Sequence, residues 1–368
     1  MTSVAIIYDK FLVQGGGERV CEMLVEAFPD ARLYALNARP RRFWEEKLGR
    51  RIVSPPLGWL FGSRFLVSAL YPLAALVMSM TRVRADVVIV YSSTCGKFAR
   101  LDCQQSILYS NYPNRGLYQP EKIVRSRFVR AMLYPAMALM RPIERRRLRQ
   151  FDRRFSISDT SRRALLDFSG LDSDILMPPF NEQGMAAPVA GRSSEEPYFV
   201  LVSRLEPEKD VGYVIDAFRP LPHRLKVIGT GSQLTQLRQA SSDNVEFLGY
   251  VDDAALAQEL AGARALIFPS EIEYSLVPLE ALFHGTPVVS FAAPAMREIL
   301  VDVDGGGADA NALFYNERTA DALAGAIARF DSIAWDPEIV KRGAARFGRA
   351  AFIDRVRALV YGAAANGN

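Results

Sequence analysis

The sequence predicts an α/β protein made of two doubly wound domains, each built on a parallel sheet. Its length of 368 residues exceeds that of one ordinary domain. Short β-branched runs alternate with longer helical stretches, which indicates βα units. This periodicity disappears in a polar, small-residue stretch from Gly184 to Pro197. Ligands bind beyond the carboxyl ends of parallel strands, so we expect the two domains to face a central cleft.

The predicted strands fall into two groups. Those of the first half are Val4–Tyr8, Arg32–Leu36, Asp86–Tyr91 and Gln105–Tyr109. Those of the second half are Tyr198–Val202, Arg224–Gly229, Asn244–Leu248, Arg264–Pro269 and Pro287–Phe291. Residues 1–180 and 181–345 are predicted to form the two domains, and residues 346–368 a C-terminal helix that returns to the first.

Composition limits the possible chemistry. A hydrophobic content of 49% with 23% charged residues is typical of a globular protein. Three cysteines without paired spacing, and no secretory signal, indicate a reduced, cytoplasmic protein. Two histidines leave no room for a multi-histidine metal site, so we expect neither metal nor cofactor. The sequences Asp252-Asp253 and Asp302-Val303-Asp304 are interpreted as a helix start and a solvent turn.

Positive charge is concentrated in the first half, although the net charge is only +4. Between two arginine-rich clusters lies Phe65–Met80, which is nearly uncharged but shorter than the ~20 residues that span a bilayer. This segment is either a buried helix or a helix that lies on an anionic membrane surface. The clusters lack interleaved aromatic residues, which argues against nucleic acid. They comprise Arg39, Arg41, Arg42, Lys47, Arg50, Arg51 and Arg64, then Arg141, Arg145, Arg146, Arg147, Arg149, Arg153 and Arg154.

A glycine-rich loop, Phe11–Gly17, follows the first predicted strand and precedes a helix predicted to begin near Glu18. Bare backbone amides at a helix start attract anions, which makes Gly16 and Gly17 candidate donor-binding residues. Val20 occupies the position where a dinucleotide fingerprint needs its third glycine, which argues against a nicotinamide dehydrogenase. A tight structural connection remains the alternative interpretation of the loop.

Two cations follow the first strand of the second half. Arg204 and Lys209 lie five positions apart between Tyr198–Val202 and a predicted helix. A planar guanidinium fork and an ammonium point charge can neutralise a diphosphate without a metal. Surface ion pairs with Glu206 or Glu208 are the alternative.

A second turn of this half carries Glu271 and Glu273 and runs into a helix with an early proline, Pro278. Backbone amides at the start of this helix suit a phosphate group. Glu280, about one turn further on, can accept hydrogen bonds from ribose hydroxyls. The candidate amides are those of Ser275, Leu276 and Val277.

These motifs together resemble the retaining GT-B glycosyltransferases of family four, and especially their bacterial mannosyltransferase branch. The resemblance is carried by Gly15–Glu18, by Ser203-Arg204-Leu205 with Lys209, and by Ser270–Val289. Tyr109–Tyr118 is similar to the branch's Tyr-x-His-x-Pro-x-Arg-x-x-Tyr element. The resemblance implies an acceptor-binding N-terminal domain and a nucleotide-sugar-binding C-terminal domain, both Rossmann-like.

The chain departs from the family pattern at two positions. Asn111 replaces the histidine of the Tyr-x-His element, and an amide can donate hydrogen bonds but cannot act as a general base. Arg115 keeps the arginine of that element and is a candidate acceptor-side residue.

The second departure concerns the sugar-facing carboxylate. The family's two glutamates are seven residues apart, and counting back from Glu280 leads to Ile272. Glu271 and Glu273 flank Ile272, and we favour Glu273 as the replacement because the backbone path of this turn is altered.

The resemblance implies transfer of a sugar, mannose from GDP-mannose, to a hydroxyl of a lipid-linked or cell-surface glycan with retention of configuration. Arg204, Lys209, Glu273 and Asn111 are then the candidate catalytic residues. The expected location is cytoplasmic, peripheral at the inner face of the cell membrane. A catalytically silent sugar-nucleotide-binding subunit and a GT-B-like nucleotide-sugar epimerase are the alternatives.

Overall fold

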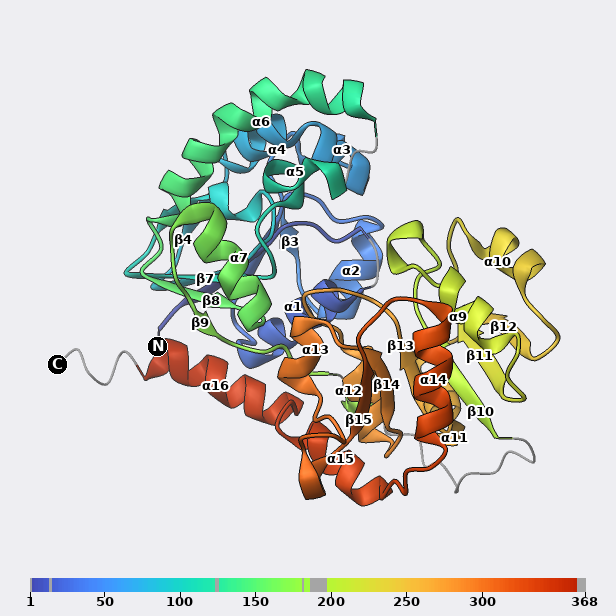
Figure 1. Ribbon diagram of the computed structural model, residues 1–368. Coiled ribbons are helices and arrows are strands. Elements are labelled where there is room, and N and C mark those ends of the chain that lie inside the picture. Colours follow the sequence, from blue (N-terminus) through green and yellow to red (C-terminus); the bar gives the residue numbers. More distant parts are fainter. Residues whose placement is uncertain (1, 13–14, 123–125, 181, 186–196, 363–368) are drawn as a thin grey trace. The chain divides into compact units, whose positions relative to one another are not determined.

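The computed structural model describes residues 2–12, 15–122, 126–180, 182–185 and 197–362 (Figure 1). The chain divides into two compact units by its internal contacts. Unit 1 comprises Met1–Pro178 and Ala350–Asn368, and unit 2 comprises Pro179–Arg349. Each unit is built on its own parallel sheet, which confirms the predicted α/β fold class of two doubly wound domains. The predicted central cleft concerns the placement of the units and stays a prediction.

The described part of unit 1 contains a parallel sheet in the order β3-β2-β1-β5-β7-β8-β9. The strand bounds are β1 (Val4–Tyr8), β2 (Arg32–Ala35), β3 (Ile52–Val53), β5 (Val87–Tyr91), β7 (Gln105–Ser110), β8 (Arg153–Ser156) and β9 (Asp174–Ile175). A separate small sheet pairs β4 (Arg82–Arg84) with β6 (Arg100–Asp102). The strands predicted in the first half are confirmed, with ends shifted by one residue at most. Strand order reverses between β1 and β5, which makes their carboxyl ends the switch point of unit 1.

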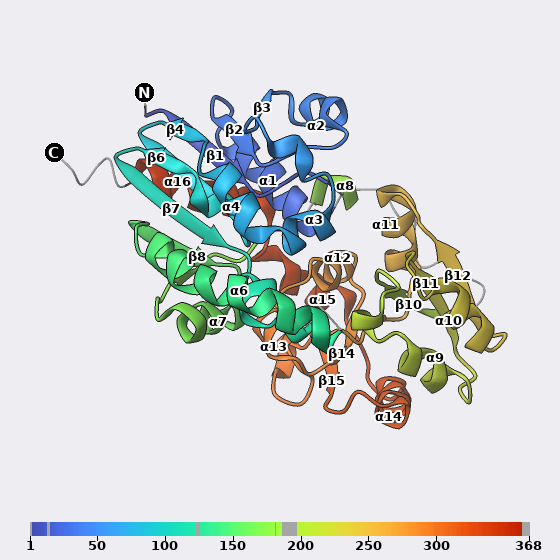
Figure 2. The same cartoon turned by 90° about the horizontal axis from the view of Figure 1, so that it is seen from above.

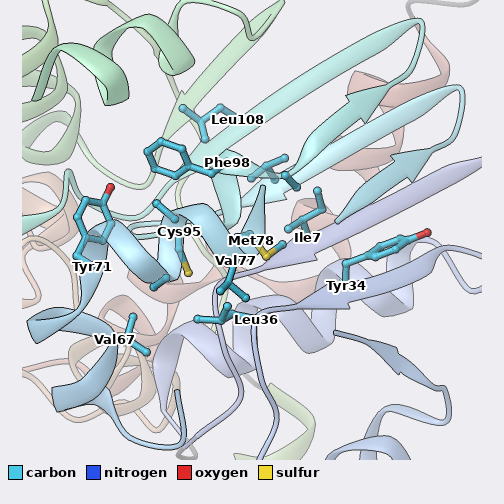
Figure 3. Packing of buried hydrophobic residues seen from close by; sticks show 14 of the residues in the cluster. Ile7, Tyr34, Leu36, Val67, Tyr71, Val77, Met78, Cys95, Phe98 and Leu108 are labelled. Atoms are coloured by element: carbon cyan, nitrogen blue, oxygen red, sulfur yellow. The ribbon is translucent and has the colours of Figure 1, made fainter. Parts of the chain in front are cut away.

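Helices cover both faces of this sheet. The α-helices are α1 (Gly16–Ala27), α2 (Arg41–Leu48), α3 (Arg64–Ala69), α4 (Tyr71–Met78), α5 (Arg115–Tyr118), α6 (Arg127–Leu148), α7 (Asp159–Ser169) and α16 (Arg349–Tyr361). The short 3-10 turns are η1 (Gly58–Leu60), η2 (Gly96–Phe98) and η3 (Pro120–Lys122). Figure 3 shows how Tyr71, Val77 and Met78 of α4 pack with Ile7 and Leu108 of the sheet. Burial of these apolar side chains is the main stabilising contribution within unit 1.

The predicted apolar segment Phe65–Met80 forms two short helices, α3 and α4. Their inward side chains, such as Val67 and Tyr71, are buried. Phe65 is 76% exposed and Leu76 is 62% exposed, so the interpretation of the segment as a buried helix is wrong for its outward half. Exposed apolar side chains at this density mark an interaction surface.

The described part of unit 2 contains a parallel sheet in the order β12-β11-β10-β13-β14-β15. The strand bounds are β10 (Tyr198–Val202), β11 (Arg224–Ile228), β12 (Val245–Gly249), β13 (Leu266–Phe268), β14 (Val288–Phe291) and β15 (Ala312–Tyr315). Counted from β10, this is the Rossmann order 3-2-1-4-5-6, with its switch point between β10 and β13. All five strands predicted for the second half are present.

The helices of unit 2 are distributed over both faces of the sheet. Figure 2 shows α11 on one face of β10–β12, with α9 and α10 on the other. The α-helices are α8 (Glu182–Met185), α9 (Gly212–Phe218), α10 (Leu234–Ala240), α11 (Asp253–Gly262), α12 (Val277–Phe283), α13 (Pro294–Ile299), α14 (Ala320–Phe330) and α15 (Pro337–Ala345). The 3-10 turns are η4 (Pro207–Lys209) and η5 (Gly307–Asp309).

The segments Asp252-Asp253 and Asp302-Val303-Asp304 have the structural roles that the sequence predicted, a helix start and a turn. The Asp252 carboxylate accepts a hydrogen bond from the Ala255 amide at 2.8 Å and caps α11. Asp304 lies in a turn and pairs with Arg329 at the surface. Within the described ranges, no group of three or more histidine, cysteine or acidic side chains lies close enough to hold a metal ion.

The last helix, α16, packs in unit 1. The Arg357 Nε donates to the Ala27 carbonyl at 3.0 Å, and the rings of Tyr361 and Phe28 are 5.9 Å apart. Phe352 lies 6.3 Å from the ring of Tyr109 on β7. The chain therefore contributes to unit 1 from both of its ends.

Candidate functional site

The switch point of unit 2 lies between two loops that contain the predicted nucleotide-binding residues. β10 and β13 are paired through Val200 and Leu266, and each is followed by one of these loops. Residues 203–210 follow β10 and contain Arg204 and Lys209, and residues 269–276 follow β13. Val200 and Leu266 are 66 positions apart in the sequence, yet their pairing brings the two candidate segments to one edge of the sheet. Doubly wound folds bind ligands at this edge.

The loop after β10 has a fixed backbone. The Ser203 amide donates to the Ile228 carbonyl at 3.0 Å, and the Leu205 amide donates to the Thr230 carbonyl at 2.9 Å. A Cβ atom at Gly229, which has φ +134°, would lie 1.9 Å from the Ser203 oxygen. Only glycine fits there, so the loops after β10 and β11 approach each other closely through their backbones.

The cations of this loop lie at its surface. Arg204 is exposed, and its guanidinium lies 3.6 Å from the Glu208 carboxylate, a distance and exposure that give a weak ion pair. Glu206 instead accepts a hydrogen bond from the Ser232 Oγ at 2.6 Å, and the hydrogen bonds from Ser232 lower the pKa of the Glu206 carboxyl. Lys209 ends η4 and is half-buried. Of the two surface pairs considered from the sequence for Arg204, the structure contains the one with Glu208.

The turn after β13 leads into α12. Ile272, Glu273 and Ser275 are half-buried, and Glu271 is exposed. Leu276 occupies the N-cap position without a side-chain hydrogen bond, and its carbonyl accepts from the Glu280 amide at 2.9 Å. Pro278 lies in the first turn, as the sequence predicted, and the Glu280 side chain is buried.

Sequence reasoning missed a side chain that joins the two loops. Arg318 follows β15; its guanidinium donates to the Asp210 carboxylate at 2.9 Å and lies 3.7 Å from the Glu271 carboxylate. Asp210 has φ 51°, a left-handed conformation that is uncommon for a residue with a side chain. The Tyr213 hydroxyl adds a hydrogen bond to the Pro269 carbonyl at 3.3 Å. No motif marks Arg318, and only its position after the last strand could have indicated it.

In unit 1, the glycine-rich loop begins α1 earlier than predicted. The helix begins at Gly16 and not near Glu18, so Gly16 and Gly17 form its first turn. Residues 13–14 of the predicted loop lie outside the described residues. A Cβ atom at Gly17 would lie 2.8 Å from the Tyr8 hydroxyl, whose ring stacks on Tyr91 at 5.5 Å. Glycine is needed here so that the helix can approach this aromatic pair.

The carboxylate of Asp9, just after β1, fixes the switch point of unit 1. It accepts hydrogen bonds from the Ser92 Oγ at 2.6 Å and from the amides of Ser93, Thr94 and Gly96 at 2.7–2.8 Å. Burial tends to raise the pKa of the Asp9 carboxyl, but the charge of nearby lysines and these hydrogen bonds outweigh it and lower the pKa. The sequence analysis did not single out this residue.

Asn111 directly follows β7 in unit 1, and Arg115 is the first residue of α5. The Asn111 carbonyl accepts a hydrogen bond from the Ser161 Oγ at 2.8 Å, which fixes the backbone after β7. Arg115 begins α5 and stacks on the Tyr112 ring at 5.0 Å. The predicted site residues therefore form two sets: Gly16, Gly17, Asn111 and Arg115 in unit 1, and Arg204, Lys209, Glu273, Ser275, Leu276, Val277 and Glu280 in unit 2.

Comparison with known families decides the class of unit 2. Residues 196–331 match the family described as "Glycosyl transferases group 1". This part of the chain is similar to the group 1 glycosyl transferases. The matched residues include both loops at the switch point, so the family match and the geometry point to the same edge of the sheet.

Curated relatives of this chain have several activities. A sulfoquinovosyl transferase of Arabidopsis thaliana is 30% identical over 134 residues, which cover 36% of this chain and 26% of that protein. A phosphatidyl-myo-inositol mannosyltransferase of Mycobacterium leprae is 27% identical over 165 residues, which cover 42% of this chain and 44% of that protein. The chain spans 26% to 44% of the length of the curated relatives it matches.

Solved structures resemble this chain over its whole length. Anabaena Alr3699/HepE in complex with UDP-glucose has a TM-score of 0.69 at 17% identity, over 98% of this chain and 100% of that one. Sucrose-phosphate synthase from Thermosynechococcus elongatus has a TM-score of 0.72 at 18% identity, over 100% of both chains. The fold is therefore GT-B.

Proposed function

We propose that the protein is a retaining glycosyltransferase that moves a sugar from a nucleotide-sugar donor to a hydroxyl of a lipid-linked or cell-surface glycan. The observation that carries the proposal is the position of Arg204 and Lys209 at the switch point of the group 1 segment. In an open parallel sheet this edge is where ligands bind. Two cations there can neutralise a diphosphate without a metal ion.

Catalysis by this site is electrostatic. Negative charge develops on the departing diphosphate, and Arg204 and Lys209 stabilise it together with the backbone amides of Ser275, Leu276 and Val277. Glu280 accepts hydrogen bonds from the ribose hydroxyls. The nucleophile is the acceptor hydroxyl, and a phosphate oxygen of the leaving group helps to remove its proton on the same face of the sugar.

The sugar itself is held by a turn that differs from the family pattern. Ile272 occupies the position of the family carboxylate, and Glu271 already pairs with Arg318. This favours Glu273 as the group that faces the sugar. In the same proposal Asn111 replaces the family histidine near the donor sugar, Gly16 and Gly17 contribute to donor binding, and Arg115 is the acceptor-side residue.

GDP-mannose is the proposed donor. The support is the Tyr109–Tyr118 segment, which resembles the mannosyltransferase branch of the family, and a mannosyltransferase is among the relatives of this chain. A solved structure of similar fold holds UDP-glucose, so the donor panel must include uridine nucleotides.

The acceptor is proposed to be reached at a membrane surface. Unit 1 exposes apolar side chains on α3, α4 and α6, and arginines such as Arg127 and Arg146 lie on the same long helix. Apolar side chains beside cations add up to attraction for anionic lipid. Among the described helices, none is long and apolar enough to cross a membrane. Flotation with liposomes should therefore depend on anionic lipid.

A thermal-shift panel of GDP-, UDP- and dTDP-sugars tests donor binding, because a ligand that binds only the folded state raises the melting temperature. We expect GDP-mannose to give the largest shift. Stabilisation by UDP-sugars alone would contradict the choice of mannose and leave the transferase proposal standing.

Arg204→Gln tests the diphosphate contact, with Arg219→Gln as the matched control. Arg219 is also an exposed arginine of unit 2 that pairs with a nearby carboxylate. We expect Arg204→Gln to lower kcat/KM by roughly 10²–10³ because a charge that stabilises the leaving group is lost. Equal effects of the two substitutions would remove Arg204 from the site.

Product analysis separates the rival functions. A silent nucleotide-binding subunit would show a thermal shift but neither donor hydrolysis nor transfer, and an epimerase would form product without acceptor. A glycosyl adduct trapped on Glu271 or Glu273 would contradict the front-face mechanism.

A further inference from the structure

Unit 1 contains an apolar groove that the proposed transfer chemistry does not use. Its volume is about 680 Å³, within the roughly 300–1,000 Å³ of small-molecule sites. One wall is α3 with Phe65 and Ala69, a second is formed by Gly116 and Pro120, and the third is the first half of α6. α6 contacts both α4 and α5, and Figure 1 shows these helices together on one side of the sheet.

Most of the α6 wall is apolar. It contributes Val129, Ala131, Met132, Leu133 and Met137 to the lining. These side chains offer dispersion contacts but no hydrogen bonds, so the groove suits a hydrocarbon.

The groove continues onto an exposed apolar stripe of the same helix. Phe128 is 79% exposed and Leu139 is 68% exposed. Together with Met132 and Ile143 they are spaced four or seven residues apart, which places all four on one face of the helix. The opposite face of α6, with Met140 and Glu144, is buried in unit 1. A molecule partly seated in the groove would therefore extend along a surface that is itself apolar.

Cations line the groove beside the apolar side chains. Arg130 and Arg141 are lining residues, and Glu121 is also part of the rim. The Arg141 Nε donates to the Leu117 carbonyl at 3.1 Å, and its guanidinium lies 5.8 Å from the ring of Tyr134. These contacts hold a guanidinium at the groove wall, where it can bind a phosphate.

The charge of α6 also favours an anionic lipid over a second copy of this chain as the molecule that occupies the groove. The α6 sequence has six arginines against a single glutamate, and that glutamate, Glu144, is buried in an ion pair with Lys97. Two copies of this helix face to face would repel each other, whereas an anionic lipid is attracted.

We infer that this groove binds one hydrocarbon chain of a lipid phosphate, with Arg141 holding the phosphate group and Arg130 adding positive charge at the groove wall. The inference deepens and rests on the proposed function, in which the acceptor is lipid-linked. The groove then selects the lipid carrier of the acceptor, a role distinct from general adhesion of unit 1 to a membrane.

The test uses the full chain and dodecyl phosphate below its micelle concentration, with dodecyl maltoside as a neutral ligand of equal chain length. Isothermal titration should show saturable binding of one dodecyl phosphate per chain and a preference over the maltoside. Arg141→Gln should reduce that preference. Absence of binding below the micelle concentration, or equal binding of both ligands to the unmodified chain, would overturn the inference.

A matched pair of tryptophan substitutions separates the groove from the surface. Ala131 lines the groove, whereas Ala136 lies on the same helix, is exposed and does not line it. Ala131→Trp should weaken binding by about tenfold or more because it occupies the space of the chain, and Ala136→Trp should leave it unchanged. Equal effects of the two would reduce the groove to surface adhesion and overturn the inference.

Two measurements keep the result interpretable. Ala69→Phe fills the groove from α3 and replaces Ala131→Trp if that variant does not fold. A chain that is dimeric in solution and becomes monomeric on Ala131→Trp would assign the groove to a second copy.

Nucleotide-induced thermal shifts of the same preparations report on unit 2, so loss of lipid binding with an intact shift refutes the groove alone. Lipid binding without any nucleotide shift refutes the proposed function and leaves a lipid-binding groove.

Discussion

The two units share one doubly wound topology but join the loops at their switch points in opposite ways. In unit 1, the buried Asp9 carboxylate ties the end of β1 to the loop after β5 with short hydrogen bonds. In unit 2, the half-exposed Arg318 guanidinium spans Asp210 and Glu271 on either side of the switch point. The first is a buried, fully bonded carboxylate and the second a solvent-screened ion pair.

This difference suits different tasks. A buried charge with all its hydrogen bonds made holds one conformation, because any movement strands a charge in an apolar interior. An exposed ion pair costs little to rearrange. The switch point of unit 1 is therefore a rigid support, whereas the side chains that join the two loops of unit 2 can rearrange when a charged ligand arrives and leaves.

The largest effect is expected where the buried network of unit 1 continues. The Lys97 ammonium lies 2.5 Å from the Glu144 carboxylate, with side chains 3% and 0% exposed, and the Tyr71 hydroxyl donates to the same carboxylate at 2.9 Å. Lys97→Met should destabilise unit 1 by about 3–5 kcal/mol because Glu144 is left buried without its cation. Hydrogen exchange of β5 peptides measures the loss within unit 1.

The double substitution Lys97→Met with Glu144→Met is the control, since it removes both charges and should recover much of the stability. A double variant as unstable as Lys97→Met would show that the packing around the pair, and not the stranded charge, dominates.

Asp9→Ala should cost about 3 kcal/mol, because it leaves several buried amide donors after β5 without an acceptor. The exposed counterpart Glu206→Ala, which also loses hydrogen bonds between two loops, should cost less than about 1 kcal/mol. Urea unfolding followed by hydrogen exchange in each unit measures both. Similar costs would abolish the contrast between the two switch points.

Arg318→Met should change the stability of unit 2 by only about 1 kcal/mol, since the pair is partly exposed and solvent screens its charges. It should weaken nucleotide binding by about tenfold, because the loops that carry Arg204 and Glu273 lose their common tether. Arg297→Met, which removes another arginine of unit 2 whose guanidinium contacts Asn316, is the matched control. A fall in kcat with unchanged KM would instead place Arg318 in the chemical step.

The smallest effect is a pH dependence confined to unit 1. The pKa of Asp9 is lower in the folded protein than its ordinary value, so its contribution to stability is complete above a pH of about 4 and is lost as the pH falls through the folded pKa. Asp9→Asn should flatten the acid limb of the stability of β1 and β5, measured by hydrogen exchange. An unchanged limb would mean that other carboxylates dominate acid unfolding.

The sequence predicted the strands and the switch-point loops of unit 2 because their signals are local. β-branched runs and the order of Arg204, Lys209 and Glu280 can be recognised without knowing what packs against them. The start of α1 was predicted two residues late, since glycines are poor helix formers, but the first turn has unpaired amides in any helix and tolerates them.

The contacts that distinguish the two units could not be predicted in the same way. Asp9 and Ser92 are 83 positions apart, and Arg318 and Asp210 are 108 positions apart. Neither pair lies in a motif, and only the strand order brings the partners together. The sequence left open whether Phe65–Met80 is buried or lies on a surface for a similar reason, because local periodicity does not reveal which side of an apolar helix is covered by another helix.

The return of α16 to unit 1 has a consequence for synthesis on the ribosome. Unit 2 is one continuous stretch, Pro179–Arg349, and all of it has been made before the residues that contact Ala27 and Phe28 emerge. Domains generally fold as units in the order of synthesis. Unit 1 is therefore begun first but completed last, when its final helix has been made. Truncation of this helix should expose unit 1 to proteolysis while unit 2 stays protected.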